Sequence, residues 1–235
     1  MTPLIRDDFL AALVGRPTFR VALASDGGNT AIFAAIRAAQ RHPVFLYARV
    51  PTTSVDTVRQ LEELGFRVVD TNVTFKGVVS GGRSNSGATR WARPGDRNAV
   101  MTLAAHCFDH SRLHLDPMIP RAVADRSRAE WAGNFFAGKR GDHMILGECD
   151  GALAGFAQLI GPRDGVLTID LIGVAAPFRR RGVAGSLVSA AGAITGTQLL
   201  RVGTQIANIG SLRLYEGLGF RIAETHYVLH YHKIY

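Results

Sequence analysis

The chain has 235 residues, 47% of them hydrophobic and 20% charged, which is typical of a globular protein with one large or two small domains. The formal net charge of +8 favours an anionic partner, but the basic residues form only one triplet, so small polyanions explain the charge as well as nucleic acid does. Two cysteines, Cys107 and Cys149, suit a reducing cytoplasm and are too few for a disulfide framework.

No segment has the pattern of a signal peptide or a membrane span. Asp7 and Asp8 interrupt the first apolar residues, which argues against a signal peptide. Residues 182–200 carry no charge, but they are rich in Gly, Ala, Ser and Thr, so we expect a helix, a turn and a strand there. The sequence therefore predicts a soluble, cytoplasmic protein that binds neither nucleic acid nor membrane.

In chain order, residues 1–78 are predicted to form a small N-terminal domain that includes a strand at 44–50. Residues 79–89 are rich in Gly and Ser and predict a flexible linker. Residues 90–235 are predicted to form the larger C-terminal domain, which opens near a short strand at 89–92.

Two helices and a hairpin are predicted next. Apolar residues recur with helical periodicity over 98–108 and 121–136. Asp150-Gly151 separates apolar runs at 143–149 and 152–160, and Asp-Gly in that position is a strong signal for a two-residue hairpin turn.

The most informative feature of the sequence is the segment from Val166 to Val188. An aliphatic strand over 166–175 leads into Arg179-Arg180-Arg181-Gly182-Val183-Ala184-Gly185, which is predicted to open a helix. The first amides of a helix have no intrahelical partner, the helix dipole adds positive charge there, and the guanidinium groups suit phosphate. The glycine offsets fit neither a P-loop nor a dinucleotide-binding loop. We expect this loop to hold a pyrophosphate.

A second element follows across a predicted strand at 199–205. Asn208 is followed by six residues, then Tyr215, three residues, and Gly219-Phe220. A helix is predicted over 208–218, and Asn208 is expected to be its N-cap.

Together, these two elements resemble the signature of the GCN5-related N-acetyltransferases. The first matches the family's acetyl-CoA loop as Arg-x-x-Gly-x-Ala at Arg179, Gly182 and Ala184, and the second matches the helix that follows one strand later. The resemblance implies an enzyme that transfers acetyl from acetyl-CoA to a small-molecule amine. It also implies a twisted mixed sheet between helices.

In this family the strand before the loop splays from its neighbour, and the pantetheine arm of the cofactor lies in the gap. The resemblance therefore assigns backbone pairing with the cofactor to the end of that strand. The residues expected to bind acetyl-CoA are Ile172, Gly173, Val174, Arg179, Arg180, Arg181, Gly182, Val183, Ala184, Gly185, Asn208, Ser211 and Tyr215.

Tyr215 is the expected general acid. The resemblance places its hydroxyl near the sulfur, and a phenol with a pKa near ~10 stays protonated at neutral pH. Without the flanking motif, a tyrosine in such a helix would be read as a core or rim aromatic residue. Asn208 is also expected to contact the cofactor.

The acceptor side is less specific in the sequence. Histidines at 106, 110 and 114 allow a metal site, but prolines soon end the helix and no second ligand set follows, so we favour a loop facing the substrate and expect no metal. His110, Arg112 and His114 are the candidate substrate-binding residues. The general base stays open among His110, His114, Asp109, Asp116 and water.

The N-terminal region repeats part of the C-terminal pattern. Leu64-Gly65-Phe66-Arg67-Val68-Val69-Asp70-Thr71 parallels Leu218-Gly219-Phe220-Arg221-Ile222-Ala223-Glu224-Thr225. At this offset Tyr215 corresponds to Leu61 and Asn208 to Ser54, so the first copy keeps the packing and lacks the chemistry. The sequence therefore predicts an α/β protein in which a GCN5-related fold follows a degenerate half-acetyltransferase domain; chance similarity is the alternative.

A closer resemblance concerns the substrate. Phe108-Asp109-His110-Ser111-Arg112-Leu113 and Trp131-Ala132-Gly133-Asn134 resemble elements of the dTDP-fucosamine acetyltransferases, which implies a dTDP-linked 4-amino-4,6-dideoxy sugar as acceptor. Arg112 would contact its diphosphate or sugar. The alternatives are another small amine, such as an antibiotic, polyamine or amino acid, or a CoA-binding module without activity. A homodimer also remains open.

Overall fold

The computed structural model describes residues 2–23, 29–78 and 88–235. Most of the predicted linker at 79–89 lies outside the described residues, and its last two residues, Ala88 and Thr89, begin a strand. The described strands are β1 (Leu4–Arg6), β2 (Thr18–Val21), β3 (Val44–Pro51), β4 (Arg67–Gly77), β5 (Ala88–Trp91), β6 (His143–Cys149), β7 (Ala152–Arg163), β8 (Val166–Val174), β9 (Leu199–Gln205) and β10 (Arg221–Lys233).

The described helices are α1 (Asp8–Val14), α2 (Thr30–Ala39), α3 (Val55–Glu63), α4 (Arg97–His106), α5 (Arg121–Phe136), α6 (Val183–Gly192) and α7 (Ile209–Gly217), with 3-10 turns η1 (Pro94–Asp96) and η2 (Ala176–Phe178). The predicted bounds of α5, β6 and β9 coincide with the structure. The Asp150-Gly151 turn is also confirmed, because both residues adopt positive φ as a tight hairpin turn requires. The expected terminal strands are a single long strand, β10. None of the described helices is both long and apolar enough to cross a bilayer.

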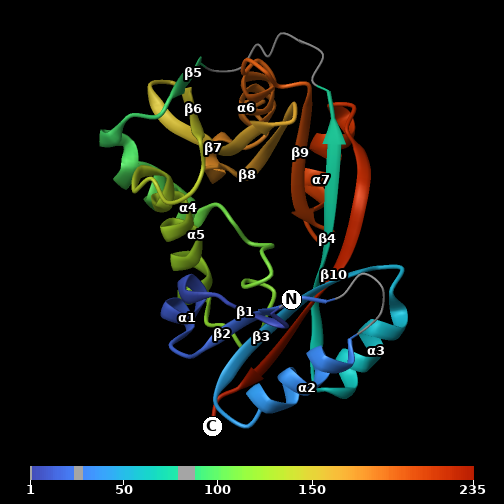
Figure 1. Cartoon of the computed structure of the whole chain (residues 1–235). Helices are drawn as coiled ribbons and strands as arrows, with labels where there is room; N and C mark the ends of the chain where they lie inside the picture. The colour runs from blue at the N-terminus through green and yellow to red at the C-terminus, as the bar shows by residue number, and fades with distance from the viewer. Residues whose placement is uncertain (1, 24–28, 79–87) are drawn as a thin grey trace.

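The described strands form one mixed sheet in the order β1-β2-β3-β10-β4-β9-β8-β7-β6-β5. Figure 1 shows β4 and β10 side by side, running between a lower half with β1, β2 and β3 and an upper half with β5 to β9. The predicted half-repeat is visible as two units, β2-α2-β3-α3-β4 and β8-α6-β9-α7-β10. We call them the N-terminal and C-terminal units.

The two units exchange their last strands. β10 pairs antiparallel with β3 of the N-terminal unit, and β4 pairs antiparallel with β9 of the C-terminal unit. The centre of the sheet therefore reads β2-β3-β10-β4-β9-β8, which is unchanged when each strand is replaced by its equivalent in the other unit. The predicted boundary between residues 1–78 and 90–235 stays a prediction, and the sheet runs continuously across it.

Equivalent helices end in the same way. At the end of α3, Gly65 adopts φ 87° and the amide of Phe66 donates to the carbonyl of Leu61 at 3.0 Å. At the end of α7, Gly219 adopts φ 83° and the amide of Phe220 donates to the carbonyl of Tyr215 at 2.9 Å. Positive φ at the residue after a helix is favourable for glycine alone, so Leu-Gly-Phe sets both turns.

Each unit buries its own hydrophobic core on the sheet. Phe66 and Phe220 follow these turns and are 0% and 1% exposed. Around Phe66 lie Ile36, Leu46, Val50 and Leu61, and around Phe220 lie Leu187, Leu200, Val202 and Tyr215, all of them buried. A third cluster packs α4 and α5 against β6, β7 and β8, and thereby fixes the α4–α5 connection over the sheet.

Candidate active site

The sheet opens between β8 and β9. These parallel strands pair from Val166 and Leu199 only as far as Ile169 and Val202. Beyond that point β8 continues to Val174 with β7 on its other side, so the edge facing β9 has no strand partner. Exposed main-chain N–H and C=O groups along such an edge can hydrogen-bond an extended polar ligand. This is the splay that the family resemblance implied.

The loop after β8 exposes a helix N-terminus beside this opening. Gly182 is the N-cap of α6 and adopts φ 79°, a conformation that glycine alone takes without strain. The first helical hydrogen bond runs from the amide of Ser186 to the carbonyl of Gly182 at 3.0 Å. The amides of residues 183–185 therefore precede the intrahelical bonds and point toward an anion position.

The three arginines of the loop have different surroundings. Arg179 donates to the carbonyls of Val174 at 3.3 Å and Cys107 at 3.1 Å, which ties the loop to β8 and α4. Arg181 pairs with Asp150 in the β6–β7 turn at 3.2 Å. Arg180 is exposed and adopts φ 64°. Arg180 is therefore the arginine best placed to approach a ligand phosphate.

A cleft of about 380 Å³ follows the opening, and we call it the loop cleft. The expected cofactor residues that line it are Ile172, Gly173, Val174, Arg179, Arg180, Ala184, Asn208, Ser211 and Tyr215. The remaining expected residues, Arg181, Gly182, Val183 and Gly185, are not among its lining residues and would act through their backbone. The structure thus brings most of the predicted set to one surface.

Gly173 shows how tightly this cleft is built. A Cβ atom at this residue would lie 2.4 Å from Sγ of Cys107. The α4–α5 connection therefore rests directly on β8, and burial raises the pKa of the Cys107 thiol to about 12, which keeps it neutral.

The predicted cap of α7 is confirmed. Oδ1 of Asn208 accepts a hydrogen bond from the amide of Ser211 at 3.2 Å. Asn208 and Ser211 also line the loop cleft. Capping and ligand contact are therefore compatible.

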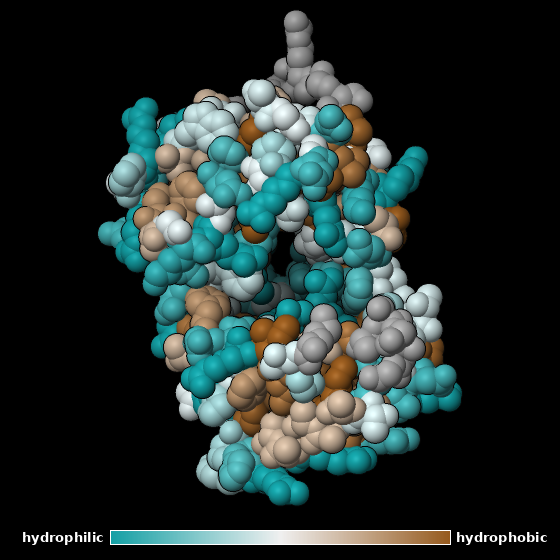
Figure 2. Space-filling model, viewed as in Figure 1, coloured by the Kyte–Doolittle hydropathy of each residue, from teal (hydrophilic) through white to brown (hydrophobic). Residues whose placement is uncertain are grey.

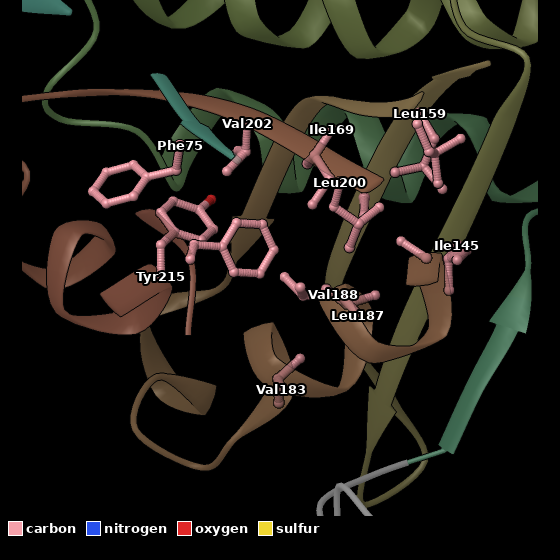
Figure 3. Close-up of a cluster of buried hydrophobic side chains, with 14 of the residues drawn as sticks. Phe75, Ile145, Leu159, Ile169, Val183, Leu187, Val188, Leu200, Val202 and Tyr215 are labelled. Carbon is pink, nitrogen blue, oxygen red and sulfur yellow. The ribbon is translucent and has the colours of Figure 1, made fainter. Parts of the chain in front are cut away.

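Tyr215 stands between the core and the ligand surface. Its ring packs 5.5 Å from Phe75 and 5.7 Å from Phe220, and Figure 3 shows it at the end of a row of aliphatic side chains. Only 1% of the residue is exposed, and burial raises the pKa of its phenol. The hydroxyl therefore stays protonated at neutral pH. Tyr215 is thus a core aromatic that also lines the loop cleft, and its role as general acid stays a prediction.

A second cleft of about 410 Å³ adjoins the first, and we call it the central cleft. Figure 2 shows a deep hollow with hydrophilic residues at its edge in the middle of this face. Seven residues line both clefts: Phe108, Ser111, Ile172, Gln205, Asn208, Ser211 and Tyr215. A group carried in one cleft can therefore meet a group held in the other beside Tyr215.

The central cleft holds two guanidinium groups without a carboxylate partner. Burial lowers the pKa of Arg128 to about 10 and also lowers the pKa of Arg112. Among the described residues, no carboxylate lies within ion-pair distance of either arginine. The guanidinium of Arg112 stacks on the ring of Tyr47 at 4.0 Å. Nε of Arg128 is buried and has no hydrogen-bond partner among the described residues. Partly buried guanidinium groups without a carboxylate partner favour an anionic ligand.

A buried network of side chains holds Arg112 in place. It contains Asp116, His230 and His232, whose potential metal-ligand atoms lie within 4.8 Å of one another. Asp116 accepts hydrogen bonds from Nδ1 of His230 and Nε2 of His232. The other ring nitrogens face arginines: Nε2 of His230 lies 3.1 Å from Arg112, and Nδ1 of His232 lies 2.6 Å from Arg16. Every ring nitrogen thus has a protein partner. Burial lowers the pKa of His230 to about 4, so this ring is neutral and can accept from Arg112. The arrangement positions an arginine.

The candidate substrate residues separate in the structure. His110 is exposed and lines the loop cleft, and Arg112 lines the central cleft. His114 is buried between Ser111 and Asp125, with both ring nitrogens engaged, and supports the loop. Asp109 pairs with Arg121. Among the side chains expected as proton acceptors, only His110 lines a cleft without a described hydrogen bond or ion pair.

Sequence reasoning missed Asp70. It lies on β4 in one row with Val228 of β10 and Arg49 of β3, all three lining the central cleft. Both carboxylate oxygens are buried without a hydrogen-bond partner in the described structure, and burial raises the pKa of this carboxyl to about 6. A carboxylate directly after Val68-Val69 inside a strand was the available signal.

Comparison with known proteins identifies the family of the chain. The model of the acetyltransferase (GNAT) family matches residues 99–220. The spore coat polysaccharide biosynthesis protein SpsD of Bacillus subtilis (strain 168) is 31% identical over 140 residues, which cover 58% of this chain and 48% of SpsD. The match thus spans about half the length of that relative.

Several solved structures share the fold. A GCN5-related N-acetyltransferase from Sphaerobacter thermophilus superposes with a TM-score of 0.64 at 15% identity, covering 97% of this chain and 75% of that one. A tandem GNAT protein from the clavulanic acid biosynthesis pathway gives 0.60 at 15% identity, covering 93% and 76%. At such identities the likeness concerns the fold alone. It confirms the predicted fold, and the tandem neighbour fits an arrangement in two units.

Proposed function

The chain belongs to the acetyltransferase (GNAT) family and is an acetyl-CoA-dependent N-acetyltransferase, and from this premise we propose that its acceptor is the amine of a nucleotide-linked amino sugar. The finer form of the proposal is a dTDP-linked 4-amino-4,6-dideoxy sugar. The single observation that carries it is the pair of partly buried arginines, Arg112 and Arg128, which line the central cleft with Tyr215 and have no carboxylate partner among the described residues.

The loop cleft fits acetyl-CoA. The unpaired amides at residues 183–185 and the exposed Arg180 suit a pyrophosphate, and the open edge of β8 at Ile172 to Val174 suits an extended chain of amides. Acetyl-CoA, when bound, supplies an acetyl thioester. We propose that the main chain along β8 orients it so that the carbonyl carbon lies where the two clefts meet.

The transfer then needs few groups. The acceptor nitrogen attacks the thioester carbon, the carbon–sulfur bond breaks, and Tyr215 gives its hydroxyl proton to the departing sulfur. The surplus proton of the nitrogen goes to water, and the phenol regains its proton from solvent. Tyr215 suits this role because a phenol is protonated at neutral pH and because it lines both clefts.

The central cleft suits an acceptor that carries phosphate. Arg112 and Arg128 provide fixed positive charge, and Arg112 is held in place by Asp116 and His230. The motif residues of the closer resemblance also meet here, since Phe108, Ser111, Arg112 and Trp131 all line this cleft. SpsD, named for polysaccharide biosynthesis, supports a sugar as the acceptor.

The proposal is tested by measuring thiol release with four acceptors: a dTDP-linked amino sugar, a UDP-linked amino sugar, the same sugar without nucleotide, and a polyamine. We expect kcat/KM for a nucleotide-linked sugar to exceed that for the free sugar by at least about tenfold, because phosphate would pair with the guanidinium groups of Arg112 and Arg128. Equal rates with free amines would favour the small-amine alternative. Acetyl-CoA binding without release from any acceptor would favour an inactive binding module.

A variant ties the result to the cleft. Arg128→Gln is expected to raise KM for the nucleotide-linked sugar about tenfold and to leave the Kd for acetyl-CoA unchanged. Arg213→Gln is the matched control, since Arg213 is exposed on α7 and lines none of the clefts described above. An unchanged KM in Arg128→Gln would remove the anionic part of the acceptor from this position.

A further inference from the structure

The N-terminal unit contains a cleft of its own, which neither Tyr215 nor the loop at residues 179–185 lines. Its volume is about 470 Å³, and we call it the N-terminal cleft. It is lined by Ile5, Arg20, Val21, Ala22, Leu23, Arg49, Val50, Pro51, Ser54, Thr57, Arg201, Glu224 and His226. These residues come from β1, β2, β3 and the start of α3, together with β9 and β10 of the other unit.

This cleft is the counterpart of the central cleft under the repeat. Ser54, before α3, corresponds to Asn208 before α7, and both line their respective clefts. On the exchanged strands, Glu224 of β10 corresponds to Asp70 of β4, and again each lines one cleft. The internal symmetry of the sheet therefore generates two clefts.

The opening that produces it is also repeated. β2 and β3 pair in parallel from Thr18 and Phe45 only to Arg20 and Tyr47. β3 then continues to Pro51 without β2 beside it, just as β9 continues beyond its last pair with β8. The same local divergence thus leaves a cavity in each unit.

The chemistry of the reaction is absent from this copy. Leu61 is fully buried at the place equivalent to Tyr215, so no phenol reaches the cleft from α3. Leucine has no ionisable group, so it cannot donate a proton as a general acid. The N-terminal cleft is therefore suited to binding a ligand and not to acetyl transfer.

Its lining is cationic on one side and apolar on the other. Arg20 is exposed and has no ion pair among the described residues, Arg49 bonds to Asn72 at 2.8 Å, and Arg201 pairs with Glu224 at 2.9 Å. Val21 and Val50 are among the apolar residues of the wall. A ligand with phosphate at one end and a flat ring at the other matches this distribution.

Arg49 and Arg201 line both the N-terminal cleft and the central cleft. A single molecule can therefore extend past these two guanidinium groups from one cleft into the other. We propose that the N-terminal cleft binds the nucleoside of the acceptor, that the diphosphate extends from Arg20 past Arg49 and Arg201 toward Arg112 and Arg128, and that the amino sugar lies beside Tyr215 in the central cleft. The proposal rests on the proposed function and extends it: the unit without a general acid supplies the binding site for the nucleotide.

The first experiment is calorimetry on the full chain with dTDP and with UDP, which carry the nucleoside diphosphate and no amine. We expect one site per chain for at least one of them, and about a tenfold weaker Kd in Arg20→Gln. Arg37→Gln is the matched control, because Arg37 is an exposed arginine on α2 outside the described clefts. The same Kd in Arg20→Gln and wild type would overturn the proposal.

Kinetics separate this proposal from the proposed function. Arg20→Gln should raise KM for the nucleotide-linked sugar about tenfold while kcat, KM for acetyl-CoA and KM for the free sugar stay unchanged. The bound diphosphate should compete with the acceptor. Competition with acetyl-CoA alone, or two acetyl-CoA molecules per chain, would overturn the assignment of the cleft. If no nucleotide-linked sugar is acetylated, the proposed function fails, while the calorimetry still decides whether the cleft binds a nucleoside diphosphate.

Discussion

The two units follow the same path and differ in what they place along it. Each has a parallel strand pair that diverges, a helix ending in Leu-Gly-Phe, and a last strand given to the other unit. In the C-terminal unit, α7 carries Tyr215 and is capped by Asn208. In the N-terminal unit, Leu61 and Ser54 occupy the equivalent positions, and the side chain of Ser54 makes no capping hydrogen bond. The fold is thus maintained by backbone and core, independently of the chemistry.

The exchange of strands makes the units interdependent. Asp70 belongs to the N-terminal unit but lines the central cleft, whereas Glu224 belongs to the C-terminal unit but lines the N-terminal cleft. Their surroundings differ: Glu224 pairs with Arg201, while the oxygens of Asp70 lack partners. Neither unit can complete its cleft alone. We therefore expect the two units to unfold together, although their clefts carry different chemical groups.

The largest effects are expected in the two cores. Phe66→Ala and Phe220→Ala should each lower the free energy of unfolding by about 3–5 kcal/mol, because both rings are buried at equivalent places. Since each unit contains a strand of the other, denaturant should unfold either variant in one transition. The exposed equivalents Val68→Ala and Ile222→Ala serve as controls and should change stability by less than ~0.5 kcal/mol. Two separate transitions would contradict the interdependence.

Tyr215→Phe should lower kcat about a hundredfold, equivalent to about 2.7 kcal/mol in the barrier, and leave the Kd for acetyl-CoA nearly unchanged. The reason is the loss of the proton donor with retention of the packed ring. Tyr231→Phe removes a phenol that packs on Phe66 in the N-terminal unit, and kcat should stay at the wild-type value. Stopped-flow and steady-state thiol release measure both. Full turnover by Tyr215→Phe would end the assignment of the general acid.

Gly182→Ala tests the loop at the start of α6. At φ 79° a Cβ costs about 1–2 kcal/mol, which the loop can relieve only by moving the amides away from the phosphate position. Acetyl-CoA affinity should fall about tenfold by calorimetry. An unchanged Kd would show that these amides do not hold the ligand.

Asp70→Asn should raise the free energy of unfolding by about 1 kcal/mol at pH 7 and have no effect near pH 4. Burial raises the pKa of Asp70 to about 6 in the folded chain, above its value in the unfolded chain. The contribution of Asp70 to the free energy of unfolding is therefore fully present below its unfolded pKa and is lost as the pH rises through about 6. Urea unfolding at both pH values measures this. Glu224→Gln, at the equivalent place, should give no gain, because it loses an ion pair with Arg201.

The smallest effect concerns the helix that bears the acid. Gly217→Ala should stabilise the chain by about 0.5–1 kcal/mol, because glycine is unfavourable inside a helix and a Cβ here meets no atom within 4 Å. The equivalent residue of α3 is Glu63, a good helix former. Thermal unfolding should show the gain with kcat unchanged. A loss of stability would mean that Gly217 has a packing role.

Local patterns predicted much of this fold. The bounds of α5 and β9, the Asp150-Gly151 turn and the cap at Asn208 are set by neighbouring residues, so the sequence contains the information directly. The same holds for the loop at Gly182. Secondary structure that depends on residues close together in the chain was therefore predicted correctly.

Other features depend on pairing across long separations. The exchange of β4 and β10 joins residues about 150 positions apart, and no local pattern records it. The ion pair between Arg181 and Asp150 depends on where the β6–β7 hairpin lies, and the sequence of the loop does not specify that position.

The amino-acid sequence by itself determined the family and the cofactor, because these depend on short motifs with fixed spacing. The same motifs predict Tyr215 as the general acid. Only the tertiary structure decided which clefts exist and what they share. Asp70, Arg49 and Arg201 became cleft residues because strand pairing placed them side by side. Long-range hydrogen bonding between strands, which no short window of sequence specifies, is the physical reason for that division.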